Sequence, residues 1–301
     1  MPEQLQNDWT IFKLLSWAAS YFKEKKIDSP RLTAEILLAN SLGIKRIDLY
    51  LQYDRPVDKA ELARFKSLLK RRIKSEPVAY IIGEKGFYAS DFKVNSAVLI
   101  PRPETELLVE KAIEILQQMG VENRQNVVLE LGTGSGAIVV SLAKAIPENV
   151  YMANDISMKA LSVARENAVR IMGGKIHFFA GSWFSSLFEN EFFDLIVSNP
   201  PYIPANDVDN LQHEVRDNEP HLALDGGSDG LACYRDILMH AYKYLRPKGR
   251  ILLEIGYDQK QGIKQILEKT SRYKDAEFIK DLPGQDRMVI IKKQIDLKNF
   301  F

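Results

Sequence analysis

The chain has 301 residues, of which 46% are hydrophobic and 27% are charged, fractions typical of a globular protein rather than of a disordered, fibrous or membrane-spanning one. This length exceeds the usual size of one hydrophobic core, so we expect two domains, one small and one large. The formal net charge of +1 gives no support to extensive phosphate contacts, and we expect no direct nucleic-acid partner.

The start of the chain and its cysteine content predict a cytoplasmic protein. Met1–Asp8 is polar and carries two acids, unlike the cationic start and apolar centre of a signal peptide. No apolar run approaches the length that crosses a bilayer, so we expect no membrane partner. The single cysteine, Cys233, cannot form an internal disulfide, and we expect it to be a buried structural thiol. We also expect the protein to be a monomer.

The first part of the chain, residues 1–76, predicts a small all-helical domain. Apolar residues are spaced three and four apart in Trp9–Trp17 and again in Leu32–Leu38. Ser29 followed by Pro30 is typical of a helix cap and a first helical residue, and Gly43 is typical of a helix stop. A cluster of cations near the end of this domain fits a basic patch and a solvated helix face equally well. Its members are Lys70, Arg71, Arg72 and Lys74.

A structured linker follows, over residues 77–100. Glu76-Pro77 is expected to break the last helix of the small domain. Val78–Ile100 then alternates between apolar and polar residues, with Gly83, Gly86 and Asp91 as turn points. The pattern predicts a β-hairpin.

The remaining residues, 101–301, predict a doubly wound α/β domain. Strands and helices alternate after Pro103, which favours a parallel sheet buried on both faces. Segments 276–281 and 287–292 flank a Pro283-Gly284 turn and are expected to close the sheet as an antiparallel pair. The other predicted strands are 127–131, 150–154, 175–180, 193–198 and 250–255, and the predicted helices are 135–146, 158–172 and 234–245.

Three glycines at alternate positions, Gly132, Gly134 and Gly136, lie between the first of these strands and the following helix. Glycine lets the backbone turn tightly and approach a ligand where a Cβ would clash. Asp155 ends the next predicted strand, where its carboxylate can accept both hydroxyls of a ribose. Together these residues predict a site for a nucleoside-containing ligand.

The glycine loop alone leaves the cofactor open. Gly132, Gly134 and Ala137 also satisfy the G-x-G-x-x-A spacing of dinucleotide folds, so a nicotinamide or flavin oxidoreductase is one alternative. Gly136 and the upstream Glu130 favour S-adenosylmethionine, which has no pyrophosphate and can lay its methionine moiety over the glycines. A tight turn without a ligand is a further alternative.

The loop Asn199-Pro-Pro-Tyr202 follows a predicted buried strand, at the end of the sheet where ligands bind in open α/β folds. The side chain of Asn199 and the carbonyl of Pro200 could accept the two hydrogens of an NH₂ group. Pro200 and Pro201 fix φ, and Tyr202 offers a flat face for a planar group. Unless the loop is merely a turn, it predicts methylation of a planar, conjugated NH₂ nitrogen.

Such a nitrogen is a poor nucleophile because its lone pair is delocalised. Hydrogen bonds that pull its hydrogens out of the plane localise that pair, and the same acceptors bind more strongly as positive charge builds on nitrogen. In-line attack on a sulfonium methyl needs orientation and desolvation more than a strong base.

Taken together, these residues resemble the release-factor glutamine methyltransferases, the HemK or PrmC family. Three further stretches look like that family: Pro77–Gly83, Leu99–Glu106, and Glu219-Pro followed by Leu222–Leu231. The resemblance covers essentially the whole chain. It implies an N-terminal helical domain that helps recognise the release factor and a Rossmann-like methyltransferase domain. It also implies methylation, from S-adenosylmethionine, of the side-chain nitrogen (N5) of the glutamine in the Gly-Gly-Gln motif of peptide chain release factors.

The resemblance implies roles for individual residues. Trp183 would lie near the adenine, where Ser182 replaces the acid common in methyltransferases, and Glu104 and Thr105 would approach the methionine end of the cofactor or cap a helix. The expected cofactor-binding residues are Gly132, Thr133, Gly134, Ser135, Gly136, Asp155, Trp183 and Asn199. The expected substrate-binding residues are Asn199, Pro200, Pro201 and Tyr202, of which Asn199, Pro200 and Tyr202 are the expected catalytic ones.

Alternative functions remain at this point. An adenine N6 methyltransferase acting on DNA or RNA would recognise its acceptor through the same loop, although it usually needs a basic track and a means of extracting the base. A catalytically silent binding module is also possible in principle. The four histidines lack metal-ligand spacing, so we expect no metal, and Ser135 has no nucleophile-elbow context.

Overall fold

The computed structural model describes residues 9–119 and 124–294. The polar start, Met1–Asp8, from which the absence of a signal peptide was predicted, lies outside these ranges. Within them, no helix is both long enough and apolar enough to cross a membrane.

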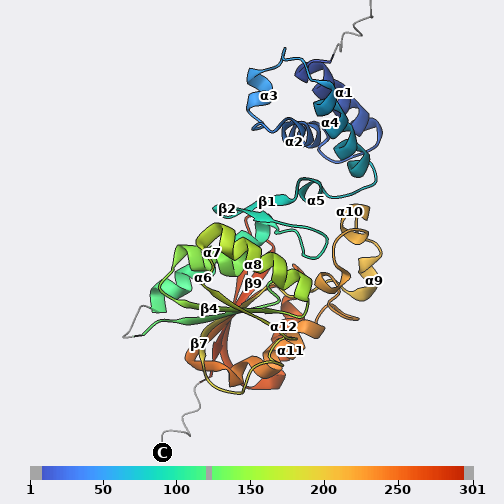
Figure 1. The fold of residues 1–301 in the computed structure, drawn as a ribbon. Helices are drawn as coiled ribbons and strands as arrows, with labels where there is room; N and C mark the ends of the chain where they lie inside the picture. The colour runs from blue at the N-terminus through green and yellow to red at the C-terminus, as the bar shows by residue number, and fades with distance from the viewer. Residues whose placement is uncertain (1–8, 120–123, 295–301) are drawn as a thin grey trace, which may run out of the picture. The chain divides into compact units, whose positions relative to one another are not determined.

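The chain forms two compact units (Figure 1). The small unit contains the chain up to Gly83 together with His213–Asn218, and the large unit contains Glu84–Gln212 and the chain from Glu219 onward. The backbone therefore returns to the small unit for one short segment. The segment boundaries expected from the sequence, which stay a prediction, are 1–76, 77–100 and 101–301.

The small unit is a group of helices around one apolar core. In the first helix the buried residues Leu14, Leu15, Ala18 and Phe22 follow the three-and-four spacing seen in the sequence. Its helices are α1 (Ile11–Glu24), α2 (Pro30–Leu42), α3 (Asp48–Leu51), α4 (Lys59–Arg72), α5 (Val78–Ile82) and α10 (His213–Arg216).

The predicted limits of α2 are confirmed: Pro30 is its first residue, and Gly43 ends it with a φ of +66°. The capping role expected of Ser29 is wrong, because this residue has a φ of +47° and its side chain makes no capping hydrogen bond. A capping box lies at the start of α4, where Asp58 and Glu61 make reciprocal hydrogen bonds.

The cationic cluster at the end of α4 includes residues that are held by carboxylates. Arg72 is buried and pairs with Glu214 of α10 at 2.6 Å, and Arg71 pairs with Glu76 at 2.5 Å. These two cations are therefore neutralised within the unit.

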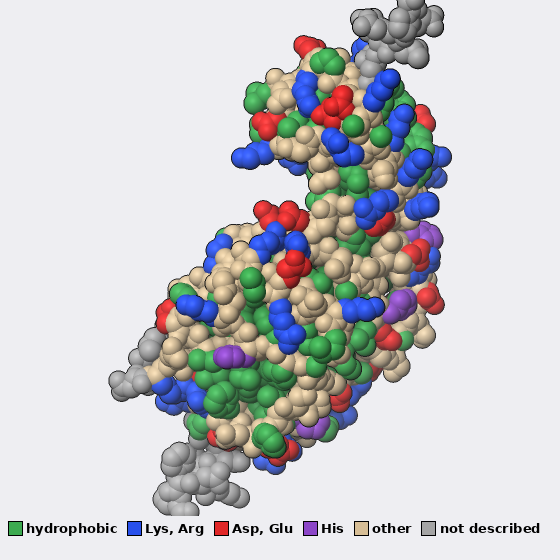
Figure 2. Space-filling model, in the orientation of Figure 1, with side chains coloured by type: hydrophobic (Ala, Val, Ile, Leu, Met, Phe, Trp, Pro, Cys, Tyr) green, Lys and Arg blue, Asp and Glu red, His purple; other side chains and the backbone are tan. Residues whose placement is uncertain are grey.

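On the face of the large unit seen in Figure 2, basic and acidic side chains are interspersed.

The predicted β-hairpin is present but shorter than expected. Residues 78–82 form the helix α5, which Gly83 ends with a φ of +81°, so the first part of the predicted hairpin is wrong. Strands β1 (Glu84–Phe87) and β2 (Ser90–Lys93) pair antiparallel, and Gly86 lies opposite Asp91 within the ladder rather than at a turn. The inward-facing Phe87 and Phe92 of this hairpin join the core of the large unit.

The large unit contains a seven-stranded sheet in the order β5-β4-β3-β6-β7-β9-β8. β5, β4, β3, β6 and β7 are parallel neighbours, and β9 pairs antiparallel with β7 and β8, as the Pro283-Gly284 turn suggested. The strands are β3 (Val127–Leu131), β4 (Val150–Asp155), β5 (Ile176–Ala180), β6 (Phe193–Ser198), β7 (Leu245–Glu254), β8 (Tyr273–Lys280) and β9 (Asp286–Lys293). The predicted α/β fold is thus confirmed.

Helices cover both faces of this sheet (Figure 1). Along β3, Val128 packs in one core with α6 and α7, while Val127, Leu129 and Leu131 pack in a second core with α11 and α12. Both cores exclude water from the central strands, which explains their nearly continuous apolar sequence. The covering helices are α6 (Glu106–Met119), α7 (Ala137–Ala145), α8 (Met158–Met172), α11 (Ala232–His240) and α12 (Lys260–Thr270).

Several helices of the large unit differ from the expectation, and α6 was not predicted. The helix α12 was not predicted, and the helix predicted over 234–245 ends at His240, is followed by a 3₁₀ turn at Ala241–Lys243, and gives way to β7 at Leu245. Leu245 is buried and pairs with Phe193 of β6, so tertiary pairing decides its conformation.

Candidate active site

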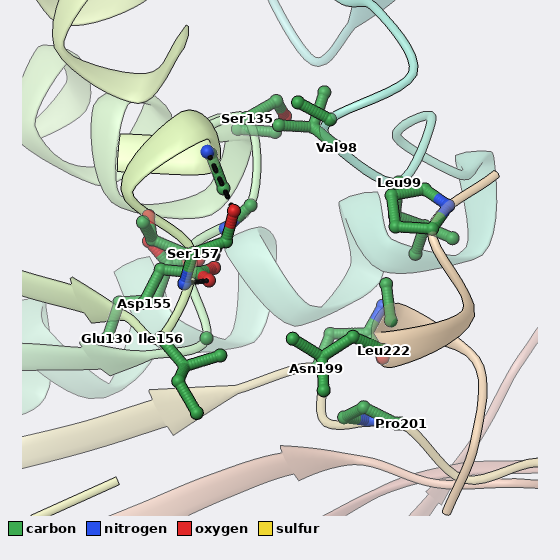
Figure 3. A pocket seen from close by; sticks show the side chains of 18 of the residues that line it. Val98, Leu99, Glu130, Ser135, Asp155, Ile156, Ser157, Asn199, Pro201 and Leu222 are labelled. Atoms are coloured by element: carbon green, nitrogen blue, oxygen red, sulfur yellow. Dashed lines mark hydrogen bonds between the residues drawn. The ribbon is translucent and has the colours of Figure 1, made fainter. Parts of the chain in front are cut away.

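A cavity of about 520 Å³ lies at the carboxyl ends of β3, β4 and β6. This is the position at which the strand order reverses, where the loops from neighbouring strands diverge and leave space for a ligand. In Figure 3, Asp155 and Ser157 lie on one side of the space, and Asn199 and Leu222 lie on the other.

The glycine loop after β3 forms one wall of this cavity. Gly132, Gly134 and Gly136 have φ values of +68°, +55° and +79°, which side chains with a Cβ rarely adopt. At Gly136 a Cβ would lie 3.1 Å from the Cβ of Ala164, so this glycine allows α7 and α8 to pack closely. Gly132 and Gly134 line the cavity, whereas Gly136 does not.

Asp155 is the last residue of β4, and its carboxylate is held by backbone donors. The N–H of Gly134 donates to Oδ2 at 2.9 Å and the N–H of Ser157 donates to Oδ1 at 2.8 Å. Each oxygen keeps a further lone pair, so the carboxylate can accept two hydroxyl groups from a ligand. Burial raises the pKa of Asp155 above its ordinary value.

Glu130, near the end of β3, is only 1% exposed but lines the cavity. Its Oε2 accepts hydrogen bonds from the hydroxyl of Thr133 and, at 3.2 Å, from the N–H of Val139. Burial nevertheless raises the pKa of Glu130 to about 8. A positive charge placed in the cavity would stabilise the ionised form of this carboxyl group.

Asn199 follows β6 directly and lines the cavity together with Pro201. Its Nδ2 donates to the hydroxyl oxygen of Thr105 at 3.2 Å, and no described residue donates a hydrogen bond to its Oδ1. Oδ1 therefore remains able to accept a hydrogen from a ligand.

Pro200 and Tyr202 lie outside the cavity lining. The Tyr202 side chain is half-buried and packs in the second core of the large unit, with its hydroxyl 3.5 Å from Oε1 of Glu254. Its backbone carbonyl accepts a hydrogen bond from Gln259 at 2.8 Å. Burial raises the pKa of Tyr202 to about 12, so its hydroxyl stays protonated.

Trp183 lies in the loop after β5 with a φ of +48° and lines the cavity beside Ser182. Its ring would be 3.7 Å from a Cβ at Gly132, and its carbonyl accepts a hydrogen bond from the buried Asn154. The indole therefore lies against the glycine loop. Such an apolar, aromatic surface suits a flat heterocycle.

Comparison with known proteins identifies the family. A release factor glutamine methyltransferase from Geobacter sulfurreducens is 42% identical over 281 residues, which cover 93% of this chain and 96% of that protein. One from Chlorobaculum tepidum is 40% identical over 292 residues, which cover 95% of this chain and 98% of that protein. The chain belongs to the release factor glutamine methyltransferase family. The resemblance based on its motifs is thereby confirmed.

Two family models match separate parts of the chain. Residues 13–83 match the PrmC N-terminal domain, and residues 105–228 match the methyltransferase small domain. Among solved structures, the hMettl16 catalytic domain in complex with MAT2A 3′UTR hairpin 6 aligns with a TM-score of 0.54 at 13% identity, covering 80% of this chain and 84% of that one. This last similarity is one of fold.

The structure brings most of the predicted site residues of this family member to one cavity. Gly136, Pro200 and Tyr202 are not part of the lining, and the roles of all the predicted residues remain predictions. The predicted residues that line the cavity are Thr105, Glu130, Gly132, Thr133, Gly134, Ser135, Asp155, Trp183, Asn199 and Pro201.

Other parts of the lining were not predicted. Residues 96–99 together with Pro101 and Arg102 form a wall, and Leu222, Ala223 and Asp225 come from a distant loop. The buried Glu219 joins these segments, because it accepts hydrogen bonds from Arg102 at 2.6 Å and from the Ile100 N–H at 3.1 Å. Their only signal in the sequence was the resemblance carried by Leu99–Glu106 and Leu222–Leu231.

Cys233 also lines the cavity, so the expectation of a buried structural thiol is wrong. Partial burial raises the pKa of its thiol to about 11, which keeps it protonated and unreactive at neutral pH. In the part of the chain that the structure describes, no group of three or more histidine, cysteine or acidic residues is arranged to hold a metal ion.

Proposed function

We propose that the protein transfers the methyl group of S-adenosylmethionine to the side-chain nitrogen (N5) of the glutamine in the Gly-Gly-Gln motif of peptide chain release factors. Family membership supports the reaction, since the relatives named above bear this activity in their names. The observation that carries the proposal is that Asn199 lines the same cavity as Asp155 and the glycine loop.

The residues around the cavity fit S-adenosylmethionine. The carboxylate of Asp155 keeps lone pairs for two ribose hydroxyls, and Trp183 offers an apolar face for the adenine. Gly132 and Gly134 allow a ligand to approach the backbone, and the buried carboxyl of Glu130 suits a cationic group.

When bound, S-adenosylmethionine supplies a methyl group on a sulfonium sulfur: a new N–C bond forms as the C–S bond breaks, and the sulfur keeps that electron pair as a neutral thioether. The protein orients the acceptor. Oδ1 of Asn199 accepts one hydrogen of the glutamine NH₂ group, and the carbonyl of Pro200 accepts the other in this proposal. As positive charge builds on nitrogen both hydrogen bonds strengthen, and one N–H proton then passes to solvent water.

The other parts of the proposal are a monomeric protein in the cytoplasm whose partner is the release factor. The formal net charge of +1 supports a protein partner more than a nucleic acid, which would favour a strong basic excess. The small unit, which matches the PrmC N-terminal domain, would take part in recognising the release factor.

A competition assay tests the substrate class. Purified protein with methyl-labelled S-adenosylmethionine is given a release factor and duplex DNA in the same reaction. The label is expected on the release factor alone. Label on the DNA with an unmodified release factor would support an adenine N6 methyltransferase instead.

A further inference from the structure

The side chain of Asn199 is joined to a buried carboxylate through one hydroxyl group. Nδ2 of Asn199 donates to Oγ1 of Thr105 at 3.2 Å, and Oγ1 of Thr105 donates to Oε2 of Glu254 at 2.6 Å. Thr105 lies in the 3₁₀ turn Pro103–Thr105, and Glu254 is the last residue of β7. Three elements that are distant in sequence thus meet at the cavity, whose lining includes Thr105 and Asn199 but not Glu254.

The direction of these hydrogen bonds follows from which groups carry a hydrogen to donate. An ionised carboxylate can only accept, so the single hydroxyl hydrogen of Thr105 must point to Glu254. The hydroxyl oxygen then has only lone pairs to offer Asn199, which must present its NH₂ group to Thr105. The other half of the amide, Oδ1, is consequently the half that is free for a ligand.

We propose that Thr105 and Glu254 are positioning residues that fix the amide of Asn199 with its oxygen toward the acceptor nitrogen. The inference rests on the proposed function, because an amide acceptor needs an oxygen at this point. Neither residue transfers a proton to or from the substrate. Glu254 lies outside the cavity lining and acts through Thr105.

The reversed orientation becomes accessible when Glu254 is protonated. A protonated carboxyl can donate to Thr105, whose own hydrogen is then free to turn toward Asn199. The amide would rotate by half a turn and present NH₂ to the acceptor NH₂, which is two donors facing one another. Productive binding of the acceptor therefore requires the ionised form of Glu254.

The surroundings of Glu254 place this change near neutral pH. Burial raises the pKa of Glu254 to about 7, opposed by the hydrogen bond from Thr105 and by the positive charge of Arg287. Glu104 raises the pKa further and the Tyr202 hydroxyl lowers it, while Tyr234 donates to the Glu254 backbone carbonyl at 2.9 Å. Turnover is thus expected to rise as pH increases through about 7.

Two substitutions of Thr105 test the role of its hydroxyl. Thr105→Val keeps the shape but removes the hydroxyl, and kcat is expected to fall about tenfold, the effect of one lost hydrogen bond. Thr105→Ser keeps the hydroxyl and is expected to restore most of the rate. Because Thr105 itself lines the cavity, the dissociation constant for S-adenosylmethionine is measured in both variants, so that a loss of kcat is separated from a loss of cofactor binding. Thr270→Val, remote from the cavity, controls for the loss of a partly buried hydroxyl.

A spectroscopic readout separates this inference from the proposed function. The side-chain NH₂ resonances of Asn199 are expected to shift with a midpoint near pH 7 in the ligand-free protein, and Glu254→Gln or Thr105→Val should remove that shift. If this transition occurs in a protein that does not methylate release factors, the orienting contact stands and the proposed function fails. If methylation occurs but Thr105→Val leaves kcat, its pH profile and the resonances unchanged, the positioning role is overturned.

Discussion

The backbone N–H of Gly134 donates to Oδ2 of Asp155 at 2.9 Å, which links the glycine loop after β3 to the end of β4. The glycine loop and Asp155, which are separate motifs in the sequence, are therefore joined by a hydrogen bond in the structure. The carboxylate is oriented before any ligand arrives, so little conformational entropy is lost when it binds hydroxyl groups.

Asp155→Asn is expected to weaken binding of S-adenosylmethionine by about tenfold or more, because hydrogen bonds to a charged acceptor contribute about 1.5–3 kcal/mol. Isothermal titration calorimetry measures the change. Asp258→Asn, at an exposed position, is the matched control and should bind the cofactor normally. Unchanged affinity in Asp155→Asn would show that the ribose binds elsewhere.

The glycines of the loop are expected to differ in their response to alanine. Gly136→Ala should lower the free energy of unfolding by about 1–3 kcal/mol, since the new methyl group meets Ala164 at 3.1 Å. A Cβ at Gly134 would have no described atom within 4 Å, so Gly134→Ala should lower the free energy of unfolding by only about 1 kcal/mol, through backbone strain. The new methyl group should nevertheless obstruct the cavity. Thermal unfolding and cofactor titration of both variants separate packing from binding. Equal losses of affinity would contradict the distinction.

The pH dependence of stability is expected to reflect Glu130. Its pKa of about 8 in the folded protein lies above its ordinary value, so the folded state binds the proton more tightly. The free energy of unfolding of the ligand-free protein should therefore fall as pH rises from about 4.5 to 8, by about 4 kcal/mol. Glu254 contributes in the same direction.

Glu130→Gln should flatten most of this slope, as measured by denaturant unfolding at several pH values. The wild-type protein should also bind S-adenosylmethionine more tightly as pH rises toward 8, because the cationic cofactor favours the ionised carboxyl. A slope that persists in Glu130→Gln would assign the titration to another group.

Asn199→Ala is expected to abolish methyl transfer, because in the proposed function Oδ1 of Asn199 holds the acceptor nitrogen. Tyr202→Ala should weaken acceptor binding and spare cofactor affinity. Because the Tyr202 hydroxyl lies 3.5 Å from Glu254, Tyr202→Phe separates this contact from the ring and should be nearly active. Steady-state kinetics with a release factor distinguishes effects on kcat from those on KM. Near-normal turnover by Asn199→Ala would exclude its proposed role.

Much of the sheet could be predicted because its central strands are buried on both faces. Val127–Leu131 and Phe193–Ser198 are mostly apolar segments, and the structure forms strands over the same residues. The helix α12 was missed because only Ile263 is fully buried and most of its other residues are polar. Residues 78–82 were read as extended, although a single turn of helix buries Tyr80 and Ile81 equally well.

Site residues within one local sequence motif were predicted, whereas contacts between residues distant in sequence were missed. Gly132, Asp155 and Asn199 lie at the carboxyl ends of strands that are neighbours in the sheet, so their convergence follows from the fold. The link from Thr105 to Glu254 joins residues 149 positions apart, and no local pattern reveals it. The position of the Tyr202 ring depends in the same way on core packing around β7.

The position of the transferred methyl group tests the central claim most directly. After reaction with S-adenosylmethionine, peptide mass spectrometry of a release factor is expected to find one added methyl group on the glutamine of its Gly-Gly-Gln motif, and none in a Gln→Ala variant. A methyl group on another residue, or undiminished transfer to the Gln→Ala variant, would contradict the account.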